Sequence, residues 1–213
     1  MRYIRRAVVI GAVIAASAAA VAPVRHALLR HAGRLLVVAD SLDPTHPPTL
    51  ISMDVESGPA GAIALSDLYR AQPTAAVGLL VRGVTNVDRE LERRGVVVPD
   101  VIAEMLTQLG VPRSAVMRIP AGEGGTTETA AALAYWARTH PASHVLVVVG
   151  PSHGRRYQRA LSRVWPAGQP APSVVTTPHG LFRADDWWQS RTTLREGLVE
   201  LEKLALDYGR HPW

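Results

Sequence analysis

The sequence predicts an α/β domain with a mostly parallel five-stranded sheet and helices on both faces, preceded by one amino-terminal transmembrane helix. Strand-like and helix-like patterns alternate along the chain, which is typical of this fold class. The strands are continuous apolar runs, as expected when both faces of a sheet are covered. Residues 7–24 carry no charge and are just long enough to span a bilayer as a helix.

The amino-terminal segment has a basic flank at residues 1–6, followed by the apolar run. We expect a single-pass anchor in a bacterial cytoplasmic membrane, contacting lipid through residues 7–24. A cleaved signal peptide and secretion is the alternative, with residues 18–20 as the cleavage site, although the run is long for that role. A buried soluble helix is a third, less favoured interpretation. The arginines on the two sides slightly favour an extracytoplasmic domain.

The charge of the chain is concentrated at its amino terminus. Residues 1–34 contain six of the 23 basic residues and no acid, which leaves 17 basic against 18 acidic residues in the remainder. A nucleic-acid-binding domain is expected to have its own basic excess, so we expect no nucleic-acid partner. Cysteine is absent, which excludes disulfides and thiolate chemistry.

The elements follow in order along the chain. Residues 25–48 predict a juxtamembrane helix and a Pro-rich connector, and residues 49–213 the α/β domain. The expected strands are 49–53, 75–81, 115–119, 145–149 and 173–177. The expected helices are 62–71, 99–109, 126–138, 154–165 and 191–208, with loops at 55–61 and 82–88.

Polar groups follow several of these strands. Asp54, residues 122–128 and residues 152–156 all lie where a strand ends. Ligands of parallel sheets bind outside the carboxyl ends of the strands, so these groups are expected to converge.

The glycine-rich turn before residue 126 is a candidate anion cradle. Its predicted ligand-binding residues are Gly124, Gly125, Thr126 and Thr127, because free N–H groups and the helix dipole at a helix start attract anions. A simple turn with Thr126 as helix cap is an equal alternative. The turn has neither the P-loop pattern nor the dinucleotide fingerprint, so no cofactor is assigned.

Glu128 and His153 are the predicted catalytic residues. Glu128 could act as a base or orient His153, although a carboxylate in the first turn of a helix can also be a cap. His153 and Arg156 share one side of a helix start, where they could bind an oxyanion, and Ser152 and Asp54 complete the predicted ligand-binding set. A structural histidine and a solvated arginine are the alternative. No dense acid and histidine cluster exists along the chain, so no metal site is expected.

Three features together resemble the SanA/YdcF/ElyC family of bacterial envelope proteins, a domain of unknown function. They are a Thr-Glu signature before an Ala-rich helix at 126–130, an apolar strand followed by His-x-x-Arg at 145–156, and Trp187-Trp188 before a helix with Glu196, Glu200 and Lys203. The segment after the first strand departs from the family, because its glycines come late. Gly150-Pro151-Ser152 also replaces the usual Thr-Ser.

The resemblance implies a Rossmann-like fold, membrane association and a role either in envelope barrier function or in the use of lipid carriers for cell-wall polymers. We therefore expect an envelope protein that binds an anionic small molecule or a lipid-linked phosphate. In the catalytic version of this hypothesis, it also hydrolyses or transfers the phosphate-bearing ligand. A non-catalytic binding or scaffold protein is the first alternative. A nucleotide or S-adenosylmethionine binder is the second.

Overall fold

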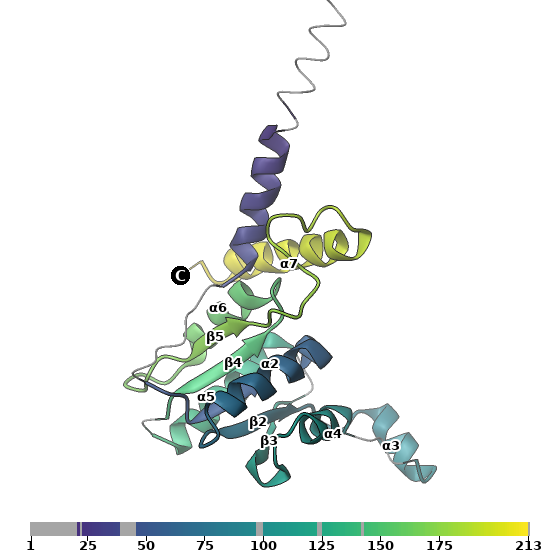
Figure 1. Cartoon of the computed structure of the whole chain (residues 1–213), viewed down its shortest axis with the longest axis vertical. Coiled ribbons are helices and arrows are strands. Elements are labelled where there is room, and N and C mark those ends of the chain that lie inside the picture. The colour runs from purple at the N-terminus through teal and green to yellow at the C-terminus, as the bar shows by residue number, and fades with distance from the viewer. Residues whose placement is uncertain are drawn as a thin grey trace, which may run out of the picture.

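The protein contains a five-stranded, all-parallel sheet with strand order β3-β2-β1-β4-β5 (Figure 1). The computed structural model describes residues 21, 23–38, 46–96, 100–122, 125–141 and 143–212. The strands are β1 (Leu50–Met53), β2 (Ala76–Val81), β3 (Val116–Pro120), β4 (Val145–Val149) and β5 (Ser173–Thr176). The helices are α2 (Gly58–Ala71), α3 (Asn86–Arg93), α4 (Val101–Gln108), α5 (Thr126–Thr139), α6 (Gly154–Val164) and α7 (Arg191–Arg210), with short 3-10 turns at Val55–Ser57 and Arg113–Ala115.

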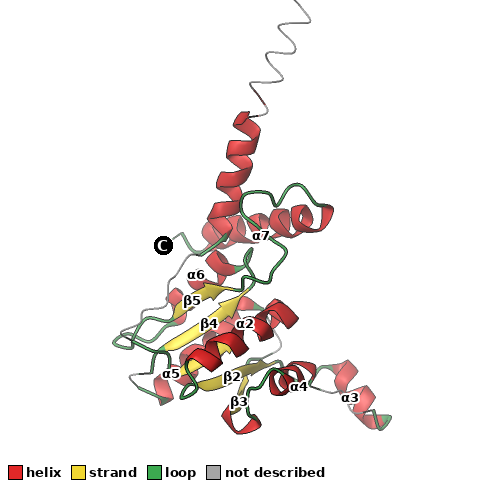
Figure 2. Ribbon diagram, viewed as in Figure 1, coloured by secondary structure: helices red, strands yellow, loops and turns green. Residues whose placement is uncertain are grey.

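Helices cover both faces of the sheet (Figure 2). Successive residues of a strand point to opposite faces, so an apolar run such as β4 supplies two cores at once. Val145, Val147 and Val149 pack in one cluster with α5 and α6 side chains. Leu146 and Val148 pack in the other with α2 and α4 side chains. The two clusters explain why the strands lack the alternation of a half-exposed sheet.

The strand order places β1 beside β4 at the centre of the sheet. The chain crosses from β1 toward β2 and β3 on one side, then returns to β4 and continues to β5. This reversal is the topological switch point at which doubly wound sheets bind ligands. Asp54, directly after β1, and residues 150–153, directly after β4, are therefore neighbours.

A third, smaller core joins the two ends of the described chain. Residues 23–36 are helical and rise from the domain beside α7 (Figure 1). Leu36, Phe182, Trp187 and Leu204 form the buried centre of this core. The indole Nε1 of Trp187 also donates a 2.8 Å hydrogen bond to the carbonyl of Leu29. Trp187 is thus a packing residue that fixes the amino-terminal helix to the domain.

The predicted α/β fold with a five-stranded parallel sheet is confirmed, and each strand lies within one residue of its expected bounds. Two predicted loops are wrong, because α2 begins at Gly58 and α3 occupies Asn86–Arg93. None of the α3 residues is buried, so no apolar stripe marked it, although Thr85 and Asp88 form a capping box at its start. Across the described ranges, no helix is long and apolar enough to cross a membrane. Residues 7–20 and 22 of the predicted anchor lie outside those ranges.

Candidate functional site

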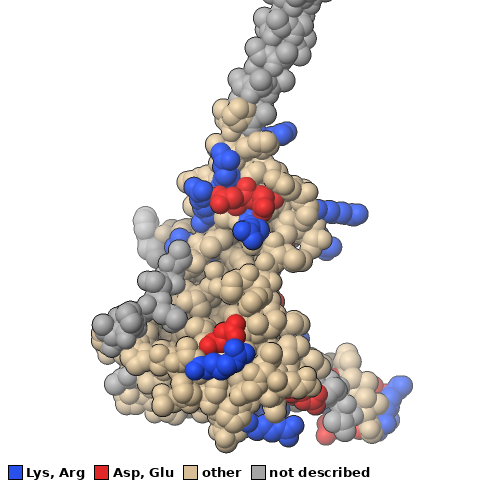
Figure 3. Space-filling view, in the orientation of Figure 1, with Lys and Arg blue, Asp and Glu red and all other residues tan. Residues whose placement is uncertain are grey.

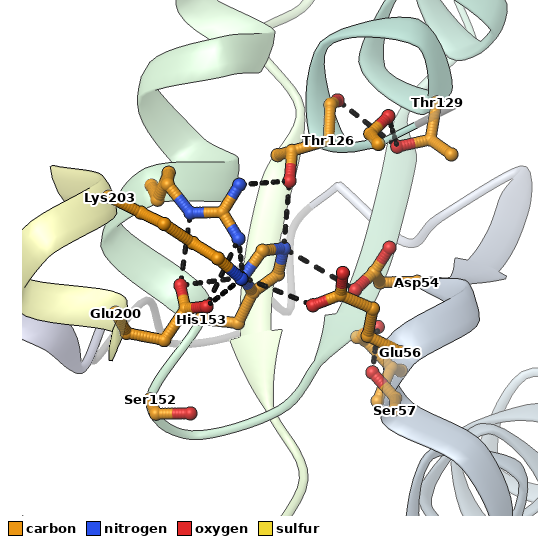
Figure 4. A network of polar contacts seen from close by, with 12 residues as sticks. Asp54, Glu56, Ser57, Thr126, Thr129, Ser152, His153, Glu200 and Lys203 are labelled. Atoms are coloured by element: carbon orange, nitrogen blue, oxygen red, sulfur yellow. Dashed lines mark hydrogen bonds and ion pairs between the residues drawn. The ribbon is translucent and has the colours of Figure 1, made fainter. Parts of the chain in front are cut away.

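His153 lies at the centre of a buried polar cluster at the switch point (Figure 4). It is the residue before α6, and its side chain is only 4% exposed. On one edge of the ring, Nε2 lies 3.2 Å from Thr126 Oγ1 and 3.4 Å from Asp54 Oδ2. On the other edge, Nδ1 lies 3.1 Å from Glu200 Oε2. The cluster therefore joins β1, α5, α6 and α7.

Arg156, one helical turn after His153, contacts His153, Thr126 and Glu200. Its Nε donates to Glu200 Oε2 at 3.0 Å, and its Nη2 donates to Glu200 Oε1 at 3.3 Å. Its Nη1 donates to Thr126 Oγ1, and its Nη2 lies 2.8 Å from His153 Nδ1. A single Nδ1 cannot accept from Arg156 and donate to Glu200 together, so the tautomer of His153 decides which contact is a hydrogen bond.

Glu200 on α7 is the carboxylate that His153 and Arg156 both contact. Lys203 Nζ adds a third donor at 2.7 Å from Glu200 Oε1. Burial acts to raise the pKa of Glu200, but hydrogen bonds from His153, Arg156 and Lys203 outweigh it and hold that pKa well below its usual range. Glu200 is therefore ionised at neutral pH. One turn earlier on α7, Glu196 accepts a hydrogen bond from Ser152.

Asp54 is a buried carboxylate whose pKa is raised, in contrast to that of Glu200. Burial raises its pKa, while the charge of His153 acts to lower it and the charge of Glu56 raises it further. Its Oδ2 has no hydrogen-bond donor among the described residues. The neighbouring Glu56 has a side chain that is 59% exposed, and its Oε2 lies 3.9 Å from His153 Nδ1. Solvent therefore reaches the cluster on the Glu56 side.

A pocket of about 220 Å³ lies beside the start of α5, between α5, α6 and α7. Thr126, Thr127 and Arg156 line one part of it. Its other charged lining residues are Arg163, Lys203, Asp207 and Arg210. On the face drawn in Figure 3, Lys and Arg side chains lie around α7 and the base of the amino-terminal helix, with a group of Asp and Glu side chains between them. The pocket combines cationic groups with the free N–H groups of a helix start, which is a favourable setting for an anion.

The structure brings together part of the predicted residue set. Asp54, Thr126, His153 and Arg156 meet in the cluster, and Ser152 is tied to it through α7. Gly125 and Thr127 are exposed at the start of α5, and Gly124 lies outside the described residues.

The structure places Glu200, and not Glu128, beside His153. Glu128 is exposed, and its carboxylate lies beside Gly122, away from the partners that the structure gives His153. Glu200 makes the contact with His153 that the sequence analysis gave to Glu128, and it was missed as a site residue. One sequence feature could have pointed to Glu200 as a site residue. It belongs to the third family signature, where its spacing places it on the same face of α7 as Glu196 and Lys203.

No protein-family model, curated protein or solved structure matches this chain. The resemblance to the SanA/YdcF/ElyC family therefore stays a prediction based on its three sequence signatures.

Proposed function

We propose that this chain is a membrane-anchored protein of the bacterial envelope that binds a phosphate-bearing metabolite, either a lipid carrier or a cell-wall precursor. The observation that carries the binding role is the cationic pocket at the start of α5. The envelope setting rests on the SanA/YdcF/ElyC resemblance and on the apolar run at residues 7–24.

The charges around the pocket favour an anion over a neutral ligand. Among the described residues, Asp207 is the one acidic residue that lines it, and Asp207 is already paired with Arg159 and Arg163. Arg156 and Lys203 share Glu200. Arg210 adds a further positive charge to the rim. A phosphate group could therefore accept from Thr126, Thr127 and the guanidinium groups without displacing a lining carboxylate.

The position of His153 favours binding without turnover. A general acid or base must come within hydrogen-bond reach of the reacting group. His153 is buried beneath Arg156 and Glu200, and both its ring nitrogens have protein neighbours. We therefore assign it a positioning role for Arg156 and Thr126. Hydrolysis or transfer, with His153 and Glu128 as catalytic groups, is the alternative form of the proposal.

Calorimetry in a buffer that contains a chelator tests the pocket. The probes are inorganic phosphate and a short-chain isoprenyl phosphate, added to the purified chain. Arg210→Gln should weaken binding by about fivefold, the effect expected for one charge-assisted contact of about 1 kcal/mol. Arg138→Gln, at the far end of α5, is the matched control and should bind as the wild type does. Equal affinity of all three proteins would contradict the pocket assignment.

Turnover separates the binding form from the catalytic form. Release of inorganic phosphate from the isoprenyl phosphate, abolished by His153→Gln with binding retained, would favour catalysis. Binding with no release favours the positioning role. Co-purification of an adenine-absorbing molecule would instead favour the nucleotide or S-adenosylmethionine alternative.

The membrane part of the proposal concerns the start of the chain. The helix at residues 23–36 exposes Val24 and Leu28 at 60% and 65%, together with Arg25, which suits a segment close to lipid headgroups. Because the chain has no cysteine, a single Glu92→Cys substitution on the exposed helix α3 gives a clean sidedness probe. We expect this variant to be found in the membrane fraction and to be labelled by an impermeant thiol reagent in intact spheroplasts. Labelling only after lysis would reverse the proposed orientation, and a soluble, shortened chain would support the signal peptide.

A further inference from the structure

The cluster around His153 contains a second candidate site, adjacent to the phosphate pocket, because His153 Nε2 lies 3.2 Å from Thr126 Oγ1, which lines that pocket. Asp54, Glu56 and His153 each offer one donor atom, and these three atoms lie within 4.8 Å of one another. Asp54 directly follows β1, Glu56 lies in the 3-10 turn Val55–Ser57, and His153 lies in the loop between β4 and α6. The parallel pairing of β1 with β4 brings these distant parts of the chain together.

The unsatisfied oxygen of Asp54 is an independent sign of a missing ligand. Asp54 is 3% exposed, and its Oδ2 accepts no hydrogen bond among the described residues. A buried carboxylate oxygen normally has a donor, because leaving it without one costs free energy. The atom it faces is His153 Nε2, at 3.4 Å, which is beyond a good hydrogen bond between these groups.

This separation suits two ligands of one metal ion. Zinc binds imidazole nitrogen and carboxylate oxygen at about 2.1 Å, and two such ligands in a tetrahedral shell lie about 3.4 Å apart. Glu56 is mostly exposed, so its side chain is free to move from its present 3.9 Å contact with His153 Nδ1 toward the same ion. The fourth position would face solvent on the Glu56 side.

The groups behind His153 fit this arrangement as well. A metal on Nε2 requires the proton on Nδ1, and histidine ligands of metals usually donate that proton to a carboxylate. Glu200 Oε2, 3.1 Å from Nδ1, is placed to accept it. Thr126 Oγ1 would then give up its 3.2 Å contact with Nε2, and Arg156 would give up its contact with Nδ1 and keep its bonds to Glu200 and Thr126.

The local charge also favours a cation. Arg156 and Lys203 together offer two positive charges, and one is balanced by Glu200. The carboxylates of Asp54 and Glu56 add two negative charges. With neutral His153, these five charged side chains therefore have a net charge of −1. A divalent ion would reverse that excess and bind the Oδ2 atom of Asp54, which is otherwise buried without a donor among the described residues.

We propose that Asp54, Glu56 and His153 bind one divalent transition-metal cation, with Glu200 orienting His153. Two carboxylates and an imidazole suit Zn²⁺ or Mn²⁺ better than Mg²⁺ or Ca²⁺, which prefer oxygen ligands alone. This goes beyond the proposed phosphate binding and does not depend on it.

Zinc titration of the tag-free chain, in a buffer without phosphate, tests the site. We expect one tight Zn²⁺ per chain in the wild type. Glu56→Gln and Asp54→Asn should each weaken it by at least about tenfold, the scale on which ligand-shell changes act. Glu92→Gln on α3 is the exposed control and should leave the affinity unchanged. Glu56→Gln keeps the test valid if Asp54→Asn does not fold.

Crystals grown with Zn²⁺ give the direct readout, because the anomalous signal at the zinc edge should peak between Asp54 and His153. No tight binding, or affinity unchanged by Glu56→Gln and peaks only at exposed histidines, would overturn the proposal. Since phosphate binding is measured separately with chelator present, failure of either site is distinguishable from failure of the other.

Discussion

His153 Nδ1 lies 3.1 Å from Glu200 Oε2, which joins the end of the central strand β4 to the last helix of the domain. Through this contact α7 becomes part of the polar cluster at the switch point, although it is not part of the sheet. The same carboxylate also binds Arg156 and Lys203. Glu200 therefore connects the packing of α7 with the geometry of the site.

Glu200→Gln should destabilise the protein. The substitution keeps the shape but removes the charge that Arg156 and Lys203 compensate, and losing one partner of a buried ion pair costs about 3 kcal/mol. Urea unfolding at neutral pH measures the loss. Glu202→Gln, exposed on the same helix, is the control and should change the free energy of unfolding by less than about 0.5 kcal/mol. Equal stability of both variants would show that Glu200 is not an anchor of α7.

The sheet could be predicted because a strand that is buried on both faces appears in the sequence as a continuous apolar run. A strand buried on both faces must be apolar at every position, as β4 is from Val145 to Val149. Its position in the chain, before a loop with His153, also predicted that His153 lies at the edge where β1 and β4 end, next to Asp54. In contrast, α3 buries nothing, so its residues carried no apolar periodicity.

The site was only partly predictable because its partners are distant in the sequence. Asp54, His153 and Arg156 follow predicted strands, and their meeting follows from the parallel topology. Glu200 lies on a helix outside the sheet; its spacing from Glu196 and Lys203 places the three on one face of that helix, but does not by itself show that this face turns toward β4. Glu128 is in a favourable place for a helix-start carboxylate, and that local role is compatible with its exposed position.

Gly197→Ala should loosen the small core that holds the amino-terminal helix. A Cβ at this position would lie 2.3 Å from Trp187 Cε3 and 3.0 Å from Phe182 Cε2, closer than packed atoms allow. Overpacking of this kind costs about 2 kcal/mol. A Cβ at Gly209 on the same helix would meet no atom of the described residues within 4 Å, so Gly209→Ala should gain a few tenths of a kcal/mol from helix propensity, up to about 1. Thermal unfolding of the two variants should therefore shift in opposite directions, and a shift in the same direction would contradict this packing.

Stability should fall in acid partly through Asp207. Burial acts to raise the pKa of Asp207, but hydrogen bonds from Arg163 and Arg159 outweigh it and lower that pKa. Because the folded pKa lies below the unfolded value of about 3.9, the contribution is complete above that value and is lost as the pH falls through the folded pKa. Asp207→Asn should cost about 1 kcal/mol at neutral pH and progressively less in acid.

Urea unfolding of wild type and Asp207→Asn at about pH 6 and about pH 2.5 measures this difference. Asp67→Asn is the control, because Asp67 and its partner Arg70 have side chains that are 50% and 60% exposed. An exposed pair of this kind should contribute little at either pH. A difference for Asp207→Asn that stays constant between the two pH values would contradict the charge-based explanation.

Arg156→Lys should separate charge from geometry in the phosphate pocket. Lysine keeps the positive charge, but its single nitrogen cannot bind Glu200 through two atoms and Thr126 through a third, as the guanidinium does. We expect phosphate affinity to fall about tenfold and the free energy of unfolding to fall by about 1–2 kcal/mol. Arg155→Lys is the matched control, since Arg155 bonds only locally to Gln158 among the described contacts. If Arg156→Lys binds phosphate as tightly as Arg155→Lys does, positive charge alone accounts for the pocket, and the bridging geometry of Arg156 serves stability and not ligand binding.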